Sequence, residues 1–435
     1  MSKAKIGILS LGCPRNLVDS ENVLGRLNLK GHKIVDIEKA DIGILNTCAF
    51  VKDAKAESIE AILDLVRLKK TSGLKKIIVY GCLVQRYKDV LRKEFPEVDA
   101  FVGRVSLSDE RKRFGLTQKH FAYLKICEGC VNNCSYCVIP KIKGRFTSLS
   151  NDLVLAQVRS LDRQGISEIN IIGQDITGYG LDIYGSLKLP QLLKRIIKNT
   201  SHALWLRLLY LHPKRVSADL LKIIRDEPKI CKYIDLPIQH INNRILRLMN
   251  RQVTKKEILS LIDKIRKILP EAAIRTSVII GFPSEKDKEF RELLDFIREV
   301  RFERLGAFIY SREEDTPAYG FKPQIPQKIK SERFNLVMSS QQIISEEINR
   351  GMLGKKIEVV IDEVDNDSYL GRSRFDAPEV DGLVYVRSKR KLKPGDFAKV
   401  KVIDTLEYDL IGEADHGDTD HGENHGDRKS WGQVP

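Results

Sequence analysis

The chain has 435 residues, of which 42% are hydrophobic and 31% charged, and its 74 Lys and Arg residues exceed its 59 Asp and Glu residues by 15. This composition excludes the intrinsically disordered and fibrous classes and supplies enough apolar mass for two or three cores. No apolar run approaches the roughly 18 residues of a membrane-spanning helix, and the first one, at residues 6–11, is too short for a signal peptide, so we expect a cytosolic protein.

Apolar, partly β-branched runs predict strands at residues 5–11, 41–45 and 76–80, with helical patterns such as 56–68 between them. This alternation predicts an α/β domain with a parallel sheet, which we place at residues 1–115. A cysteine follows each strand, in Leu-Gly-Cys13, Asn-Thr-Cys48 and Tyr-Gly-Cys82. Because parallel strands end at the same edge of their sheet, we expect the three thiols to meet there.

Eight cysteines in a reducing compartment indicate metal, cluster or redox use more than disulfides. Cys13, Cys48 and Cys82 would leave a cubane [4Fe-4S] cluster one iron short of full protein ligation. Zinc is the competing interpretation, but structural zinc usually takes four protein ligands, and no fourth Cys or His shares this pattern. Each of these cysteines taken alone is more often an ordinary buried side chain.

A second cysteine group, Cys130-Val-Asn-Asn-Cys134-Ser-Tyr-Cys137, follows the first strand of a second domain. Its CxxxCxxC spacing again provides three close thiolates and leaves one iron of a cubane open to a bidentate ligand. With Cys127 the loop also contains CxxC twice, which is typical of a four-thiolate zinc or ferredoxin-type site. The interval between those pairs is too short for a zinc ribbon. We therefore expect Cys127 to be packed, and we assign neither it nor Cys231 as a ligand.

From residue 121 onward six strand candidates alternate with helices, which predicts a partial (βα)6 TIM-like barrel in residues 116–350. The strands are expected at 121–126, 168–172, 204–211, 233–236, 274–280 and 305–309, and the helices at 152–164, 191–198, 218–225, 255–269, 285–300 and 331–349. The CxxxCxxC loop then lies at the barrel mouth, where such barrels place their active sites. Gly173 and Gln174 end the second strand at the same mouth. The segments Gln239-His240 and 281–283 end later strands, and ordinary turn chemistry explains them equally well.

Residues 351–413 are rich in strand and turn signals, with strands at 357–364, 383–387 and 397–406, and predict a small antiparallel β-barrel. Residues 355–413 carry 11 basic and 13 acidic side chains, so the positive excess lies before residue 355. That excess indicates either an anionic partner such as nucleic acid or a merely Lys-rich surface. The tail at 414–435, rich in His, Gly and Asp, is predicted to be disordered, with metal binding as the alternative.

The CxxxCxxC loop, with Tyr136 before its last cysteine, resembles the signature of the radical S-adenosylmethionine (SAM) superfamily. Two cysteine trios on successive α/β domains, followed by a small β-domain, are similar to the methylthiotransferases, a family with a cluster-binding amino-terminal domain, a radical SAM barrel and a TRAM domain. The resemblance covers almost all of the chain except the tail. It implies two [4Fe-4S] clusters: an auxiliary one on Cys13, Cys48 and Cys82, and a SAM-cleaving one on Cys130, Cys134 and Cys137, with Gly173 and Gln174 near the methionyl group of SAM.

The resemblance also implies the reaction. A radical made at the SAM-cleaving cluster removes hydrogen from an unactivated carbon, and a methylated sulfur carried on the auxiliary cluster is delivered to it. One SAM is the methyl donor and a second is the radical source. An unactivated C–H bond offers no acidic proton to a general base, so we assign no catalytic residue beyond the cluster ligands. The family implies a reduced flavodoxin or ferredoxin as electron donor, and we expect a monomer with no membrane partner.

The family divides by substrate. One branch modifies a tRNA adenosine beside the anticodon, and another modifies the β-carbon of an aspartate of small-subunit ribosomal protein twelve. The segments that resemble the ribosomal-protein branch are 10–21, 207–213, 310–319 and 377–382. A β-domain with a charge of −2 is also a poor RNA clamp, since such binding depends on Lys and Arg. We therefore predict methylthio transfer to that aspartate, with transfer to tRNA isopentenyladenosine, or a non-catalytic iron–sulfur protein that binds RNA, as alternatives. Cys127 and the tail depart from the family pattern.

Overall fold

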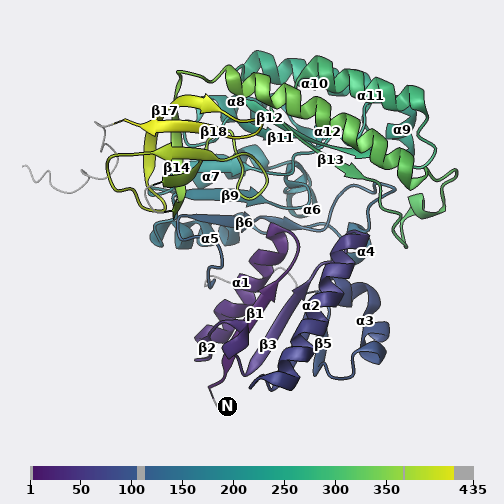
Figure 1. Cartoon of the computed structure of the whole chain (residues 1–435), viewed down its shortest axis with the longest axis vertical. Helices are drawn as coiled ribbons and strands as arrows, with labels where there is room; N and C mark the ends of the chain where they lie inside the picture. The colour runs from purple at the N-terminus through teal and green to yellow at the C-terminus, as the bar shows by residue number, and fades with distance from the viewer. Residues whose placement is uncertain (1–2, 105–112, 366–367, 416–435) are drawn as a thin grey trace, which may run out of the picture. The chain divides into compact units, whose positions relative to one another are not determined.

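The computed structural model describes residues 3–104, 113–365 and 368–415 (Figure 1). The described residues form two compact units, divided after Ile348, and the first contains both the amino-terminal sheet and the barrel. In the described ranges, no helix is both long and apolar enough to span a membrane. Nearly all of the tail predicted to be disordered, from residue 416, lies outside the described residues.

The amino-terminal domain is a parallel five-stranded sheet of order β2-β1-β3-β4-β5, as the alternation predicted. Its strands are β1 (Lys5–Ser10), β2 (Lys33–Ile34), β3 (Ile42–Thr47), β4 (Lys76–Gly81) and β5 (Ala100–Val102), and its helices are α1 (Pro14–Leu29), α2 (Lys52–Thr71) and α3 (Cys82–Glu94). Leu45, Ile62, Ile77 and Val79 are completely buried between sheet and helices. The two edge strands have only two and three residues, which is too short to show a sequence period.

The second domain contains the six predicted strands, all parallel to their neighbours, in two sheets of order β10-β9-β6 and β11-β12-β13. They are β6 (Phe121–Lys125), β9 (Glu168–Ile172), β10 (Trp205–Leu208), β11 (Tyr233–Asp235), β12 (Ala273–Ile280) and β13 (Arg304–Ile309). The amide of Leu211 donates to the carbonyl of Asp235 and that of Cys231 to the carbonyl of Leu206, each at 2.9 Å. These bonds join the two sheets into the partial barrel.

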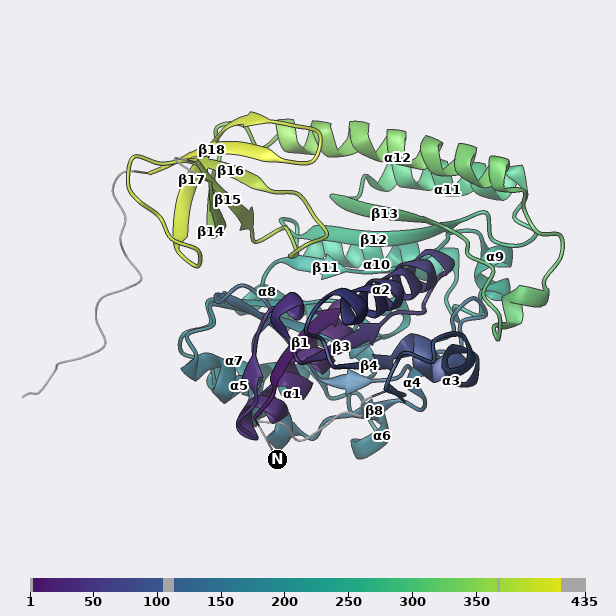
Figure 2. The same cartoon turned by 60° about the horizontal axis from the view of Figure 1, so that its bottom comes forward.

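Helices cover the outside of this barrel, and in Figure 2 α10, α11 and α12 run alongside β11 to β13. The helices of the second domain are α4 (Ile139–Lys143), α5 (Asn151–Arg163), α6 (Leu181–Tyr184), α7 (Leu189–Lys198), α8 (Ala218–Asp226), α9 (Asn243–Leu248), α10 (Lys255–Ile268), α11 (Asp287–Val300) and α12 (Gln327–Arg350), of which α4 packs instead against the amino-terminal domain. Ser150, Ser217 and Asn242 cap their helices, and Thr254 with Glu257 forms a capping box at α10. A short antiparallel pair of strands, β7 (Cys127–Glu128) and β8 (Thr147–Ser148), encloses the segment that contains the cysteine loop and α4.

The second unit is a closed barrel of order β14-β15-β16-β18-β17. Its strands are β14 (Lys356–Asp365), β15 (Ser368–Ser373), β16 (Val384–Arg387), β17 (Phe397–Thr405) and β18 (Leu410–Ala414). Alternate residues such as Val384, Val400 and Val402 point into its core. The prediction of an antiparallel barrel needs one correction, because β16 and β18 pair in parallel while the other four pairings are antiparallel. The pairing of β16 with β18 joins strands that are distant in sequence, so no local sequence pattern predicts its direction.

Candidate functional site

Cys13, Cys48 and Cys82 lie in three turns beyond the carboxyl ends of adjacent strands. Cys13 caps α1, Cys48 follows β3 directly, and Cys82 is the first residue of α3. Gly12 and Gly81 have φ of +88° and +102°, a conformation that favours glycine. A Cβ on Gly12 would lie 2.9 Å from the Cys48 sulfur, and one on Gly81 would lie 2.8 Å from a carbonyl oxygen of β3. The glycines that precede two of the three cysteines therefore let the turns approach one another.

The surroundings of this first trio favour a negative charge on Cys13 in particular. Two of its cysteines stand at the amino-terminal ends of α1 and α3, where the helix dipole attracts anions. Burial tends to raise the pKa of Cys13, but the charge of Arg15 and a backbone N–H of Asn16 hold that pKa below its ordinary value. Burial raises the pKa of Cys82 to about 12 and also raises that of Cys48. Cys13 is thus easier to ionise than its two neighbours.

The second trio lies in the loop between β7 and α4, which Ser135 fixes at the barrel mouth. The Ser135 amide donates to the Met249 carbonyl at 3.0 Å, its hydroxyl donates to the Leu248 carbonyl at 2.6 Å, and its own carbonyl accepts from Ala318 at 2.8 Å. Burial, reinforced by the neighbouring thiols, raises the pKa of Cys137 to about 12. A bound metal must therefore displace protons from this loop.

Two side chains donate hydrogen bonds to sulfurs of the second trio. The amide and side-chain nitrogens of Asn132 lie 3.4 and 3.3 Å from the Cys130 sulfur, and Arg251 lies 3.6 Å from that of Cys134. The Asn132 side chain also donates to Asp175 at 2.8 Å and accepts from Arg215 at 2.7 Å. Arg215 and Asp175 are themselves paired. The sequence pattern indicates neither donor, because a polar residue next to a cysteine, such as Asn132, need not point toward it, and Arg251 lies 117 positions from Cys134.

The turn Gly173-Gln174 follows β9 and lies against Cys127. A Cβ on Gly173 would collide with the Cys127 sulfur, and Cys127 is completely buried in the barrel core. Cys127 therefore packs beneath the turn, as expected, and Cys231 is also buried. The Gln174 side-chain oxygen is buried and has no hydrogen-bond partner among the described atoms. It is an acceptor that an ammonium group such as that of SAM could satisfy.

The chemistry of the donors suits iron–sulfur clusters. Each trio supplies three thiols, and the turn beside the second trio supplies an unsatisfied acceptor. In residues 3–104, 113–365 and 368–415, no three Cys, His, Asp or Glu side chains converge as a single metal ion would require. A cubane does not require such convergence, because its cysteines bind different irons.

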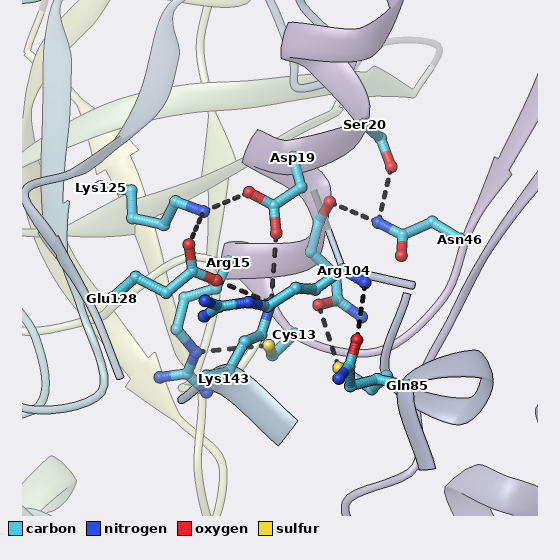
Figure 3. A network of polar contacts seen from close by, with 12 residues as sticks. Cys13, Arg15, Asp19, Ser20, Asn46, Gln85, Arg104, Lys125, Glu128 and Lys143 are labelled. Carbon is cyan, nitrogen blue, oxygen red and sulfur yellow. Dashed lines mark hydrogen bonds and ion pairs between the residues drawn. The ribbon is translucent and has the colours of Figure 1, made fainter. Parts of the chain in front are cut away.

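Arg15 joins the two candidate sites. Its Nε donates to the Cys13 sulfur at 3.4 Å (Figure 3), and its Nη1 donates to the Gly173 carbonyl at 2.9 Å. Its guanidinium also lies over the Tyr210 ring, 4.4 Å from the centroid. The first cysteine trio and the turn beside the second trio therefore contact the same side chain.

Four buried charges connect the amino-terminal domain to the barrel beside this point (Figure 3). Asp19 on α1 accepts hydrogen bonds from Lys125 and from Lys143, the latter at 3.2 Å. Glu128 accepts a hydrogen bond from Lys125 at 3.5 Å and forms an ion pair with Lys143 at 3.0 Å. All four are at most 5% exposed. Burial tends to lower the pKa of Lys143, but Asp19 and the nearby thiols hold it above its ordinary value. A permanent cation from the barrel thus stands near the first trio.

A second contact between the two domains is made by Glu313. This buried carboxylate accepts from Lys55 at 2.8 Å and from Arg86 at 3.1 Å. It belongs to segment 310–319, one of those that resemble the ribosomal-protein branch of the family. In the structure this segment holds α2 and α3 of the first domain against the barrel.

Known sequence families match three parts of the chain: the uncharacterized protein family UPF0004 at residues 5–103, the Radical SAM superfamily at 124–297 and the TRAM domain at 353–414. A protein of Clostridioides difficile named ribosomal protein uS12 methylthiotransferase RimO is 44% identical, over 94% of this chain and 98% of its own length. A protein of the same name from Caldanaerobacter subterraneus subsp. tengcongensis is 46% identical, over 94% of this chain and 99% of its own length.

Among solved structures, the radical SAM methyltransferase TsrM from Kitasatospora setae, with cobalamin and a [4Fe-4S] cluster bound, has a similar fold. The TM-score is 0.52 and the sequence identity 13%, with 82% of this chain and 79% of that chain covered. At this identity the similarity concerns the fold alone.

Proposed function

The chain belongs to the RimO family of methylthiotransferases, and from this premise we propose that it attaches a methylthio group to the β-carbon of an aspartate in ribosomal protein uS12. The relatives that carry this name match 94% of the chain at 44 and 46% identity. The observation that carries the proposal is the contact of one guanidinium, that of Arg15, with both Cys13 and Gly173. A sulfur-carrying site and a radical-generating site have to lie close together, and this contact brings the two candidate sites together.

An iron–sulfur cluster and SAM are the cofactors of this family, and we assign two [4Fe-4S] clusters to the chain. The auxiliary cluster would be held by Cys13, Cys48 and Cys82, and the SAM-cleaving cluster by Cys130, Cys134 and Cys137. When bound, the second cluster supplies the electron that cleaves SAM, and SAM supplies the radical that removes hydrogen from the substrate carbon.

The residues of the chain itself would bind and orient the clusters and SAM and shield them from water. Asn132 and Arg251 donate hydrogen bonds to the cysteines of the second trio. Gly173 lets the turn lie against Cys127, and Gln174 offers an acceptor to the methionyl amino group. None of these steps needs a general base, because the target C–H bond is not acidic.

The domain limits that we propose are 1–115 for the auxiliary-cluster domain, 116–350 for the radical SAM core, 351–413 for the TRAM domain and 414–435 for the tail. The matched families and the boundary between the compact units, after Ile348, support them. We further propose that the protein acts as a monomer in the cytoplasm and takes its electron from reduced flavodoxin or ferredoxin.

The test is to express the chain in a bacterium that lacks its own methylthiotransferases and to weigh uS12 and the tRNA nucleosides by mass spectrometry. A methylthio increment on the uS12 aspartate is expected. Cys130→Ala should abolish SAM cleavage, whereas Cys13→Ala should permit cleavage without transfer. An increment on tRNA adenosine alone would refute the substrate, and identical behaviour of the two variants would refute the assignment of the clusters.

Anaerobic reconstitution tests the number of clusters separately. Two cubanes require about eight irons per chain. About four irons would refute one of the two sites, and zinc in their place would refute both.

A further inference from the structure

Arg15 is held in one orientation by groups from both domains. On its own domain it donates to the Cys13 sulfur, and on the barrel it donates to the Gly173 carbonyl and lies over Tyr210. A planar guanidinium can make all three contacts at once, whereas a lysine ammonium is a flexible point charge.

The charge of Arg15 is directed at the first cysteine trio. In the described part of the chain it has no carboxylate partner, unlike Lys143 nearby, which two carboxylates neutralise. A partly buried cation without an anion is unfavourable, so this position suits an anion on Cys13. The thiolates of a bound cluster would provide one.

We propose that Arg15 is a positioning residue for methylthio transfer. Through its contacts with Cys13 and Gly173 it fixes the position of the auxiliary cluster relative to the SAM-binding turn. The inference rests on the proposed function and adds to it a residue that ligates no metal.

Two measurable consequences follow from the geometry. A cation that donates an N–H to a cluster ligand favours the more negative, reduced cluster and therefore raises its reduction potential. A guanidinium that also holds the Gly173 turn limits displacement between the two sites, and a misplacement of about 1 Å can cost on the order of 100-fold in rate. If the two sites are displaced from one another, SAM should still be cleaved but uS12 should not be methylthiolated.

The variants are Arg15→Met, which removes charge and donors, and Arg15→Lys, which keeps the charge. Arg86→Met is the matched control, because Arg86 also joins the two domains but does so through Glu313. The ratio of 5′-deoxyadenosine to methylthiolated uS12 is measured on the full chain with both clusters. The reduction potential of the auxiliary cluster is measured by electron paramagnetic resonance in chains whose Cys130, Cys134 and Cys137 are all Ala.

We expect Arg15→Met to make the potential more negative and to raise the product ratio by roughly 10- to 100-fold. Arg15→Lys keeps the charge, so its reduction potential should equal that of the unaltered chain, whereas its ratio of 5′-deoxyadenosine to methylthiolated uS12 should still be raised. If Arg15→Met fails to fold, the ratio measured for Arg15→Lys tests the inference. Arg86→Met should leave both readouts at the values of the unaltered chain. If the Arg15 variants match Arg86→Met in both readouts, the inference is wrong. If the unaltered chain forms no product, the proposed function fails, and an unshifted potential would then overturn the role of Arg15 independently.

Discussion

Replacing Asp19 by Asn would leave two buried lysines to share one carboxylate. Asp19 forms ion pairs with Lys125 and Lys143, and Glu128 is the second ion-pair partner of both. The four side chains are between 2% and 5% exposed, so water screens an uncompensated charge poorly. The substituted amide keeps the volume of the carboxylate and removes its charge.

The expected loss is large because the site is buried. Removing one partner of a buried ion pair typically costs about 3–5 kcal/mol. For a large domain, each kcal/mol lowers the melting temperature by roughly 2–4 °C, so a decrease of roughly 10 °C is expected. Because the charges join α1 to the barrel, the contact between the two domains should weaken first.

The assay is thermal unfolding of the metal-free chain under reducing, anaerobic conditions, followed by calorimetry. Asp36→Asn is the matched control, since Asp36 pairs with Lys39 at 3.3 Å while both side chains are 73% exposed. Exposed pairs contribute little, and a change of no more than about 2 °C is expected there.

A double variant tests the physical cause. Adding Lys125→Met to Asp19→Asn removes the excess cation, so it should recover part of the lost stability. The buried-charge explanation is refuted if the melting temperature of Asp19→Asn lies within about 2 °C of that of Asp36→Asn. It is also refuted if adding Lys125→Met lowers the melting temperature of Asp19→Asn by as much again.

Three further variants test one buried histidine and two residues of the candidate site. His240 is fully buried, and its Nδ1 accepts hydrogen bonds from two backbone N–H groups. Burial lowers the pKa of His240 to about 4. Because the unfolded chain therefore binds the proton first, the contribution of neutral His240 to stability is complete above about pH 6.5 and is lost as the pH falls toward 4. His240→Asn should reduce the acid slope of the unfolding free energy by about 1.4 kcal/mol per pH unit in denaturant titrations, and an unchanged slope would contradict this. Gly173→Ala should cost about 1–3 kcal/mol by overpacking against Cys127; adding Cys127→Ala should restore much of the melting temperature, and no recovery would exclude the clash as the cause. Asn132→Ala removes one donor to Cys130 and should make the potential of the SAM-cleaving cluster more negative in a redox titration, whereas an equal or higher potential would argue against that bond.

Much of the architecture could be predicted from local patterns. The expected strand at 168–172 is β9 to the residue, because its three β-branched residues, Ile169, Ile171 and Ile172, favour a strand. The positions of Cys13, Cys48 and Cys82 beyond successive strands also follow from local sequence, since topology then brings strand ends to one edge. The strands β15 and β18 were missed, and the parallel pairing of β16 with β18 depends on closure of the barrel.

The sequence by itself determined which residues could hold clusters and which family the chain resembles. Only the tertiary structure decided how the two candidate sites meet. Arg15 and Gly173 are 158 positions apart, and Asp19 and Lys125 are 106 apart. Helix and strand periods come from neighbouring residues, whereas a buried charge or a bridging guanidinium depends on a partner that folding brings from elsewhere in the chain. For this reason the cysteines could be read from their spacing, but the side chains that orient them could not.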